Sequence, residues 1–448
     1  MPNLEKADFR TEGNARNSDR RRLRKFKRRF CLTEGKPYSA AKLDVRPVGV
    51  LAPHSFLFLF FNLLYFLPVC ALLLFNYSEG GTSKAADLDA AVLWRIAAVY
   101  SFGLLAFLLG SRVMQKGNVF SGAGGTELGS LRLFIPTRRF GIICFVAAAV
   151  LVLSKVLLIP LGVYSEYAFE TDSMTGGIWS FSTFCSEALL FISIIVLFST
   201  TKRNVSWFFI LTAINGINLL HGTRIFTMIA CVAFCFFQYL RGKFTLRIGV
   251  ALFLAALALG YVIFLFRSNI ELDDQTFSIA RLVSPLMFEG VFSQLSLIGT
   301  IRHPEAWSIG GSAGAFVHDV VCFVIPRFLL PEKDSLLIVD KFNDLSPLGA
   351  FSGYAHGLIY FGLFFPFFYL ALGCFGSWLC GRASVSRFYS MIYIYFSCDF
   401  LFRIMRDGYL IPIKMIINTL MILALMQVYI RVGRPLPVTA GSATQIRE

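Results

Sequence analysis

The sequence predicts an all-α polytopic membrane protein. Of its 448 residues, 56% are hydrophobic and only 15% are charged, and the mean hydropathy is +0.66. A water-soluble chain of this length needs many more charged residues to cover its surface. A helix needs about 20 mostly apolar residues to cross the hydrocarbon core of a bilayer, and by that length the apolar segments predict about ten transmembrane helices.

The predicted transmembrane helices are distributed along the whole chain. They run approximately over residues 52–76, 91–110, 140–164, 179–200, 206–221, 224–240, 247–266, 356–378, 388–405 and 409–430. The fifth and sixth are short for a full crossing, and the sequence HGTR at 221–224 joins them. Irregular backbone at membrane depth is tolerated only where protein or water covers it, so we expect this turn at a protected external position.

The charges of the connections alternate along the chain. Residues 111–139 and 241–247 are rich in Lys and Arg, whereas residues 165–178 contain acidic residues and no Lys or Arg. The positive-inside rule assigns the basic connections to the cytoplasm. This predicts that both termini are cytoplasmic and that the long polar region 267–355 lies outside.

The same features divide the chain into five parts. They are a basic cytoplasmic tail (1–48), an N-terminal transmembrane bundle (49–266), an external loop with amphipathic helices (267–355), C-terminal transmembrane helices (356–430) and a cytoplasmic tail (431–448). The basic tail is typical of a segment that sets topology and contacts anionic membrane lipid, and no nucleic-acid partner is expected. The amphipathic helices, predicted over residues 283–301 and 313–330, are expected at the outer interface.

Four arginines are predicted at the external surface, and they are candidates for a shared anion site: Arg224, Arg327, Arg403 and Arg406. The planar guanidinium group matches phosphate geometry with two parallel hydrogen bonds and keeps its charge. The alternative is that these side chains extend to lipid headgroups. For Arg403 a second alternative is an ion pair with Asp399, which lies one turn earlier.

Other polar residues are candidates for catalysis or for structural ion pairs. His356 and Asp407 could each accept a proton from a hydroxyl group, and His221 is a weaker candidate. Lys155 and Glu187, in neighbouring predicted spans, could form an ion pair that holds two helices together. No Cys/His cluster has the spacing of a metal site and no nucleotide-binding motif is present, so no metal and no cofactor is expected.

Three stretches together resemble a known family. They are HGTR at 221–224, PRFLLP at 326–331 followed by SGYAHGLIYFG at 352–362, and RIMRDG at 403–408. Their order and spacing are similar to those of the bacterial oligosaccharide repeat-unit polymerases that make O-antigen and enterobacterial common antigen. The resemblance covers residues 207–430 and leaves out the basic tail.

The resemblance implies a membrane glycosyltransferase of the GT-C-like class in the bacterial inner membrane, with its active face in the periplasm. It implies that a growing glycan moves from one undecaprenyl diphosphate onto a sugar hydroxyl of another lipid-linked repeat unit, which builds an O-antigen-like surface polysaccharide. It also implies a chain-length-regulating co-polymerase as a partner. Two alternatives stay open, an O-antigen ligase with the same donor and a polysaccharide flippase or other transporter.

The residues fit the implied reaction. The leaving diphosphate is already a good anion and needs positive charge, not an acid, so the four arginines could take the place of a metal ion. The acceptor hydroxyl needs a base, which would be His356 or Asp407. The aromatic residues Trp307, Tyr354 and Tyr360 could line the path of the sugar or lipid, or serve as membrane anchors.

Overall fold

The computed structural model of the chain is mostly helical. The chain divides into two compact units, Met1–Lys42 and Leu43–Glu448, and the described residues other than Lys42 belong to the second. The structure describes residues 42–43, 52–75, 90–116, 131–132, 173–198, 202–220, 225–240, 294–305, 313–325, 336–345, 351–383 and 387–418, together with the single or paired residues 146, 150, 247, 307, 329–330, 332 and 420. The predicted spans 140–164 and 247–266 lie almost entirely outside these residues.

The helices of the N-terminal half follow the predicted apolar segments. They are α2 (Pro53–Phe75), α3 (Ala90–Lys116), α5 (Ser173–Phe198), α6 (Lys202–Asn215), α7 (Ile217–Leu220) and α8 (Ile225–Leu240). Helix α3 continues past the predicted end at residue 110, and α5 begins before the predicted start at 179. The described residues also contain two strands of two residues each, β1 (Lys42–Leu43) and β2 (Leu131–Arg132).

The C-terminal half is also helical but is interrupted more often. It contains a helix over residues 294–302, α12 (Ala313–Val324), the 3₁₀ helix η4 (Val339–Leu345), α14 (Gly353–Phe361), the 3₁₀ turn η5 (Gly362–Phe364), α15 (Phe365–Ala383), α16 (Arg387–Tyr395), the π-helical segment η6 (Phe396–Phe400) and α17 (Leu401–Asp407). A further helical stretch covers residues 410–418. The predicted helices at 283–301 and 313–330 are confirmed in part, as 294–302 and α12.

Two of the described helical stretches are long and apolar enough to cross a membrane, Ala91–Gln115 and Gly353–Ala383. Both expose large apolar side chains, such as Leu105 (62% exposed) and Phe367 (66%). Apolar surface of this kind is stable against lipid rather than water. Shorter apolar helices accompany them, including Pro53–Leu67, Thr183–Phe198 and Ile225–Leu240.

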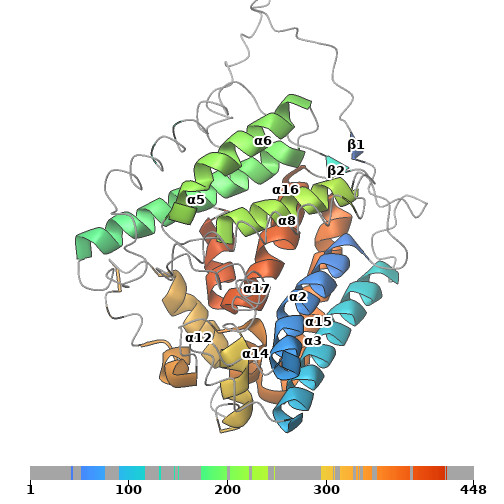
Figure 1. The fold of residues 1–448 in the computed structure, drawn as a ribbon, viewed down its shortest axis with the longest axis vertical. Coiled ribbons are helices and arrows are strands. Elements are labelled where there is room, and N and C mark those ends of the chain that lie inside the picture. The colour runs from blue at the N-terminus through green and yellow to red at the C-terminus, as the bar shows by residue number, and fades with distance from the viewer. Residues whose placement is uncertain are drawn as a thin grey trace, which may run out of the picture. The chain divides into compact units, whose positions relative to one another are not determined.

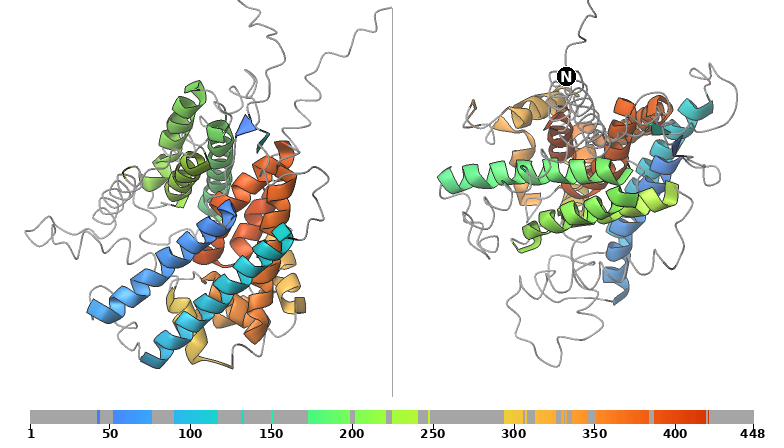
Figure 2. Two further views of the ribbon diagram at one scale, coloured as in Figure 1. Left: turned by 90° about the vertical axis from the view of Figure 1, so that its right-hand side faces the viewer. Right: turned by 90° about the horizontal axis from the view of Figure 1, so that it is seen from above.

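Helices α2, α3 and α15 pack against one another, and they run side by side in Figure 1 and in the left view of Figure 2. The contact between α3 and α15 depends on glycines. A Cβ atom at Gly373 of α15 would collide with the backbone carbonyl of Phe107, and one at Gly110 of α3 would collide with the carbonyl of Leu370. Small residues let helix backbones approach closely, which is a common way to gain packing energy between membrane helices.

The segment before α14 is fixed by capping interactions. The Ser352 hydroxyl accepts a hydrogen bond from the Ala355 amide at 3.2 Å and so caps the first turn. The Ser352 amide in turn donates to the hydroxyl of Ser296 at 2.9 Å, which ties the helix over 294–302 to the start of α14. The helix therefore begins at Gly353, three residues before the predicted start, and it breaks at Gly362, whose φ of +53° favours glycine.

Two glycines of α15 provide a test of the close packing. We expect Gly373→Ala to lower the free energy of unfolding by about 1–3 kcal/mol, because the new methyl group overpacks against a backbone atom that cannot rotate away. Gly381→Ala is the matched control, since a Cβ at Gly381 meets nothing within 4 Å. Both changes gain the same helix propensity. Thermal unfolding of the two variants in detergent measures the difference, and equal midpoints would contradict the close approach of α3 and α15.

Candidate functional site: a buried charge cluster

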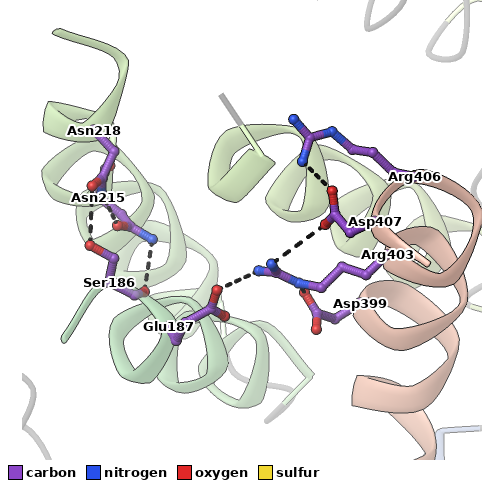
Figure 3. Close-up of polar contacts among 8 residues, drawn as sticks. All are labelled: Ser186, Glu187, Asn215, Asn218, Asp399, Arg403, Arg406 and Asp407. Atoms are coloured by element: carbon purple, nitrogen blue, oxygen red, sulfur yellow. Dashed lines mark hydrogen bonds and ion pairs between the residues drawn. The ribbon is translucent and has the colours of Figure 1, made fainter. Parts of the chain in front are cut away.

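The guanidinium group of Arg403 lies at the centre of a buried cluster of charges (Figure 3). Its Nε donates a hydrogen bond to Asp399 Oδ1 at 2.9 Å, and its Nη2 donates to Glu187 Oε1 at 2.5 Å. A longer contact of 4.0 Å joins Nη1 to Asp407 Oδ2. Arg403 is only 3% exposed, so it contacts these three carboxylates in place of water.

The spacing of the cluster along the chain explains its geometry. Asp399, Arg403 and Asp407 are four residues apart, so they share one face of the helical segment formed by η6 and α17. Glu187 reaches the same guanidinium from α5, more than 200 residues earlier (|i−j| = 216). The sequence suggested that Glu187 pairs with Lys155. Lys155 lies outside the described residues, and the partner of Glu187 in the structure is Arg403.

A neutral polar network lies beside Glu187 and connects α5 to α6 and α7 (Figure 3). The Ser186 hydroxyl donates to Asn218 Oδ1 at 3.1 Å, and Asn215 Nδ2 donates to the Ser186 carbonyl at 3.2 Å. Asn218 Nδ2 donates to both oxygens of Asn215. These buried amides were not singled out from the sequence, although two Asn side chains within an apolar segment are a signal of an interhelical network.

Arg406 is the more accessible of the two arginines. Its Nη1 donates to Asp407 Oδ1 at 2.7 Å, and its side chain is 26% exposed. Asp407 therefore contacts both guanidinium groups.

The cluster differs in charge from the expected cationic pocket. It contains two guanidinium groups and three carboxylates, so with every group ionised it carries one excess negative charge. Arg403 is enclosed by carboxylates and is not placed to bind a phosphate group. The ion pair with Asp399, given above as the alternative, is what the structure contains. Of the four candidate arginines, Arg403 and Arg406 are described, and the side chain of Arg406 is the partly exposed one of the two (26%).

The cluster lies against the beginning of α8. The Arg403 Cζ atom is 6.0 Å from the centroid of the Phe226 ring, in the first turn of that helix. Arg224 precedes this turn by one residue, and it lies outside the described residues, as do Arg327 and His221. The segment that follows HGTR is thus adjacent to RIMRDG.

His356 has a different role from the one expected of a base. It is 3% exposed, and its Nδ1 accepts a hydrogen bond from the Tyr409 amide at 3.0 Å. A neutral imidazole whose Nδ1 is an acceptor carries its proton on Nε2, so neither nitrogen has a free lone pair for a substrate hydroxyl. A Cβ at Gly408, whose φ is +72°, would collide with the His356 ring. His356 therefore fixes the turn that directly follows Asp407.

The aromatic residues expected to line a substrate path have internal partners. Tyr354 and Tyr360 are fully buried, and their hydroxyl groups donate to Asn62 Oδ1 and to Asp319 Oδ2. Trp307 Nε1 donates to the carbonyl of Thr300 at 2.7 Å. These side chains hold the helices together. No group of three or more His, Cys, Asp or Glu side chains suited to a metal ion occurs among the described residues.

The pairing of Arg403 with Glu187 can be measured by a double-mutant cycle. We expect Arg403→Met to lower the free energy of unfolding by about 3–5 kcal/mol, because it leaves buried carboxylates without a counter-charge. Adding Glu187→Gln should recover part of that loss, since it removes one of the unpaired charges. The measurement is thermal unfolding in detergent. Arg406→Met is the control. Arg406 lies on the same helix and is partly exposed, so this change should lower the free energy of unfolding much less. Additive effects of Arg403→Met and Glu187→Gln would contradict the pairing.

Comparisons with protein-family models, with curated proteins and with solved structures give no match to this chain. The resemblance to the repeat-unit polymerases therefore rests on the quoted stretches of sequence alone. A functional assignment can further draw on the structure, in which the described parts of those stretches lie close together.

Proposed function

We propose that this protein is a lipid-linked oligosaccharide polymerase of the bacterial inner membrane. In this proposal the chain crosses the membrane about ten times. Both termini are cytoplasmic and residues 267–355 face the periplasm. The donor and the acceptor are repeat units on undecaprenyl diphosphate, and the product is an O-antigen-like surface polysaccharide. A chain-length-regulating co-polymerase is a further expected partner. The enzyme uses no nucleotide, metal ion or cofactor.

The observation that carries the proposal is the convergence of three separate stretches of the sequence. The Tyr409 amide, next to RIMRDG, donates to His356 of SGYAHGLIYFG at 3.0 Å. Arg403 of RIMRDG lies over Phe226, which follows HGTR by two residues. Stretches that are far apart in the sequence and lie together in the fold are the expected arrangement of a shared site.

The reaction needs two things from the protein, a cation for the leaving group and a base for the nucleophile. The acceptor hydroxyl attacks the anomeric carbon of the donor glycan, the bond from that carbon to the diphosphate oxygen breaks, and undecaprenyl diphosphate leaves. Arginines stabilise the charge that develops on the diphosphate. We assign this role to Arg406 together with Arg224 and Arg327, and we assign Arg403 to positioning.

Asp407 is the better candidate for the base. It is an acceptor of hydrogen bonds in its ionised form, and it lies between Arg403 and Arg406, next to the guanidinium proposed to bind the diphosphate. His356 holds the turn after Asp407 and is a positioning residue in this proposal. The sequence left both residues open as the base, whereas this proposal assigns the base to Asp407 and a positioning role to His356.

A transporter of lipid-linked glycan is the second candidate function. One observation favours it: the charges of Glu187, Asp399 and Arg403 are buried between helices, and buried ionisable groups within membrane helices are typical of ion-coupled transport. An O-antigen ligase would use the same donor with a lipid A core acceptor. Purified protein supplied with lipid-linked repeat units alone separates a polymerase from the other two, because only a polymerase yields a ladder of chain lengths.

The arginines can be tested in that assay with conservative changes. We expect Arg224→Lys, Arg327→Lys and Arg406→Lys each to reduce polymer formation by about 10-fold or more, because lysine keeps the charge but loses the two parallel hydrogen bonds to phosphate. Arg302→Lys, an exposed position in the external loop, is the control and should form normal ladders. Normal ladders from all three test variants would show that these arginines only contact lipid headgroups.

The roles of Asp407 and His356 are separated by two substitutions. We expect Asp407→Asn to abolish polymer while the protein still inserts, because the amide cannot take the proton of the acceptor. We expect His356→Asn to retain much of the activity, since its side-chain oxygen can accept the Tyr409 amide in place of Nδ1. The readout is the ladder, with membrane insertion measured in parallel. Full loss in His356→Asn and normal activity in Asp407→Asn would reverse the assignment.

A further inference from the structure

A second buried carboxylate, Asp319 of α12, is held by four hydrogen bonds. Its Oδ1 accepts from the Ile338 amide at 2.8 Å and from His318 Nδ1 at 3.1 Å. Its Oδ2 accepts from the Val339 amide at 3.0 Å and from the Tyr360 hydroxyl at 2.6 Å. Asp319 is 0% exposed, so these four donors replace water completely and fix the position of the carboxylate.

The carboxylate fixes the imidazole of His318 in turn. An ionised carboxylate only accepts hydrogen bonds, so Nδ1 of His318 carries the proton and the lone pair of the ring is on Nε2. That atom lies 3.7 Å from the sulfur of Cys322, one helical turn later. The thiol therefore donates to Nε2. The side chain of His318 is 49% exposed, so it is accessible from outside the helix bundle.

The order carboxylate, imidazole, thiol is that of an activated nucleophile, in which a third group orients the base. We infer that Cys322 is a nucleophilic thiol that accepts fatty acyl groups, with His318 as its base and Asp319 as the orienting residue. This inference does not depend on the proposed polymerase activity, because none of the three residues is assigned to glycan transfer.

The surface of α12 favours a fatty acyl substrate. Val317 and Val321 are 57% and 53% exposed, and they lie on the helix face next to the stripe formed by His318 and Cys322. Exposed apolar side chains on an amphipathic helix contact lipid chains at a membrane interface. In this inference an acyl chain lies along the two valines, and its carbonyl carbon meets the sulfur of Cys322 beside His318.

The chemical step is a transfer of the acyl group to sulfur. His318 Nε2 takes the thiol proton, and the thiolate attacks the carbonyl carbon of a fatty acyl ester or thioester. The bond from that carbon to the leaving oxygen or sulfur breaks, and the leaving group takes the proton from His318. The product is an acyl thioester on Cys322 together with a free alcohol or thiol, and no oxidant or reductant is needed.

The test uses the full-length protein in detergent and the 4-nitrophenyl ester of octanoic acid. We expect octanoylation of Cys322, detected as a hydroxylamine-sensitive mass increase on its peptide, to be faster than octanoylation of Cys185. The two thiols are equally buried, at 9% and 8% exposed. We expect His318→Gln to slow the reaction at Cys322 by about 100-fold. His303→Gln is the matched control, since His303 is a similarly exposed histidine (54%) that contacts Glu305.

A second readout separates activation from packing. We expect His318→Gln to slow labelling of Cys322 by iodoacetamide and to leave the labelling of Cys185 unchanged. Thermal unfolding of this variant is measured in parallel, because His318 also donates a hydrogen bond to the buried carboxylate of Asp319. The inference is overturned if Cys322 reacts no faster than Cys185, or if His318→Gln reacts like the unchanged protein in both experiments.

Discussion

The ion pairs of Arg403 are the interaction on which the packing of the described C-terminal helices depends. A guanidinium group placed in an apolar interior loses its hydration, and that loss is offset only if carboxylates meet it at hydrogen-bonding distance. Asp399 and Glu187 do so from η6 and α5. A rotation of either helical segment would separate the charges, so the cluster selects one arrangement of the two segments. Apolar packing alone is less selective, because many rotations bury similar area.

The turn after α17 extends this constraint to a third helix. His356 of α14 accepts the Tyr409 amide, and Gly408 lies against its ring because no larger residue fits there. The carboxylate of Asp407, at the end of α17, is thereby placed between the buried Arg403 and the partly exposed Arg406. The buried ion pairs of Arg403 and the partly exposed side chain of Arg406 are therefore neighbours, and packed, hydrogen-bonded residues of this kind hold a binding side chain in position.

The sequence predicted the helical class and the positions of most described helices, since long apolar segments leave few alternatives to helix. It also offered the pairing of Arg403 with Asp399, because a spacing of four residues places both on one helix face. The pairing of Glu187 with Arg403 could not be predicted from the sequence. Contacts across more than 200 residues depend on which helices become neighbours, and hydropathy does not determine that. The hydrogen bond between His356 and the Tyr409 amide was missed for a similar reason, since an acceptor bond to a backbone amide leaves no trace in the pattern of side chains.

The excess negative charge of the cluster restricts the proposed mechanism. An anionic diphosphate is repelled by a group of three carboxylates and two guanidinium groups unless further cations are present. Arg406 alone cannot supply them, because Asp407 already accepts one of its hydrogen bonds. The additional charge must come from elsewhere in the chain, and the sequence offers Arg224 next to the start of α8 and Arg327 in the predicted external loop. A polymerase built on this fold therefore needs those two arginines at the diphosphate, whereas an ion-coupled transporter needs the acidic excess and would function without them.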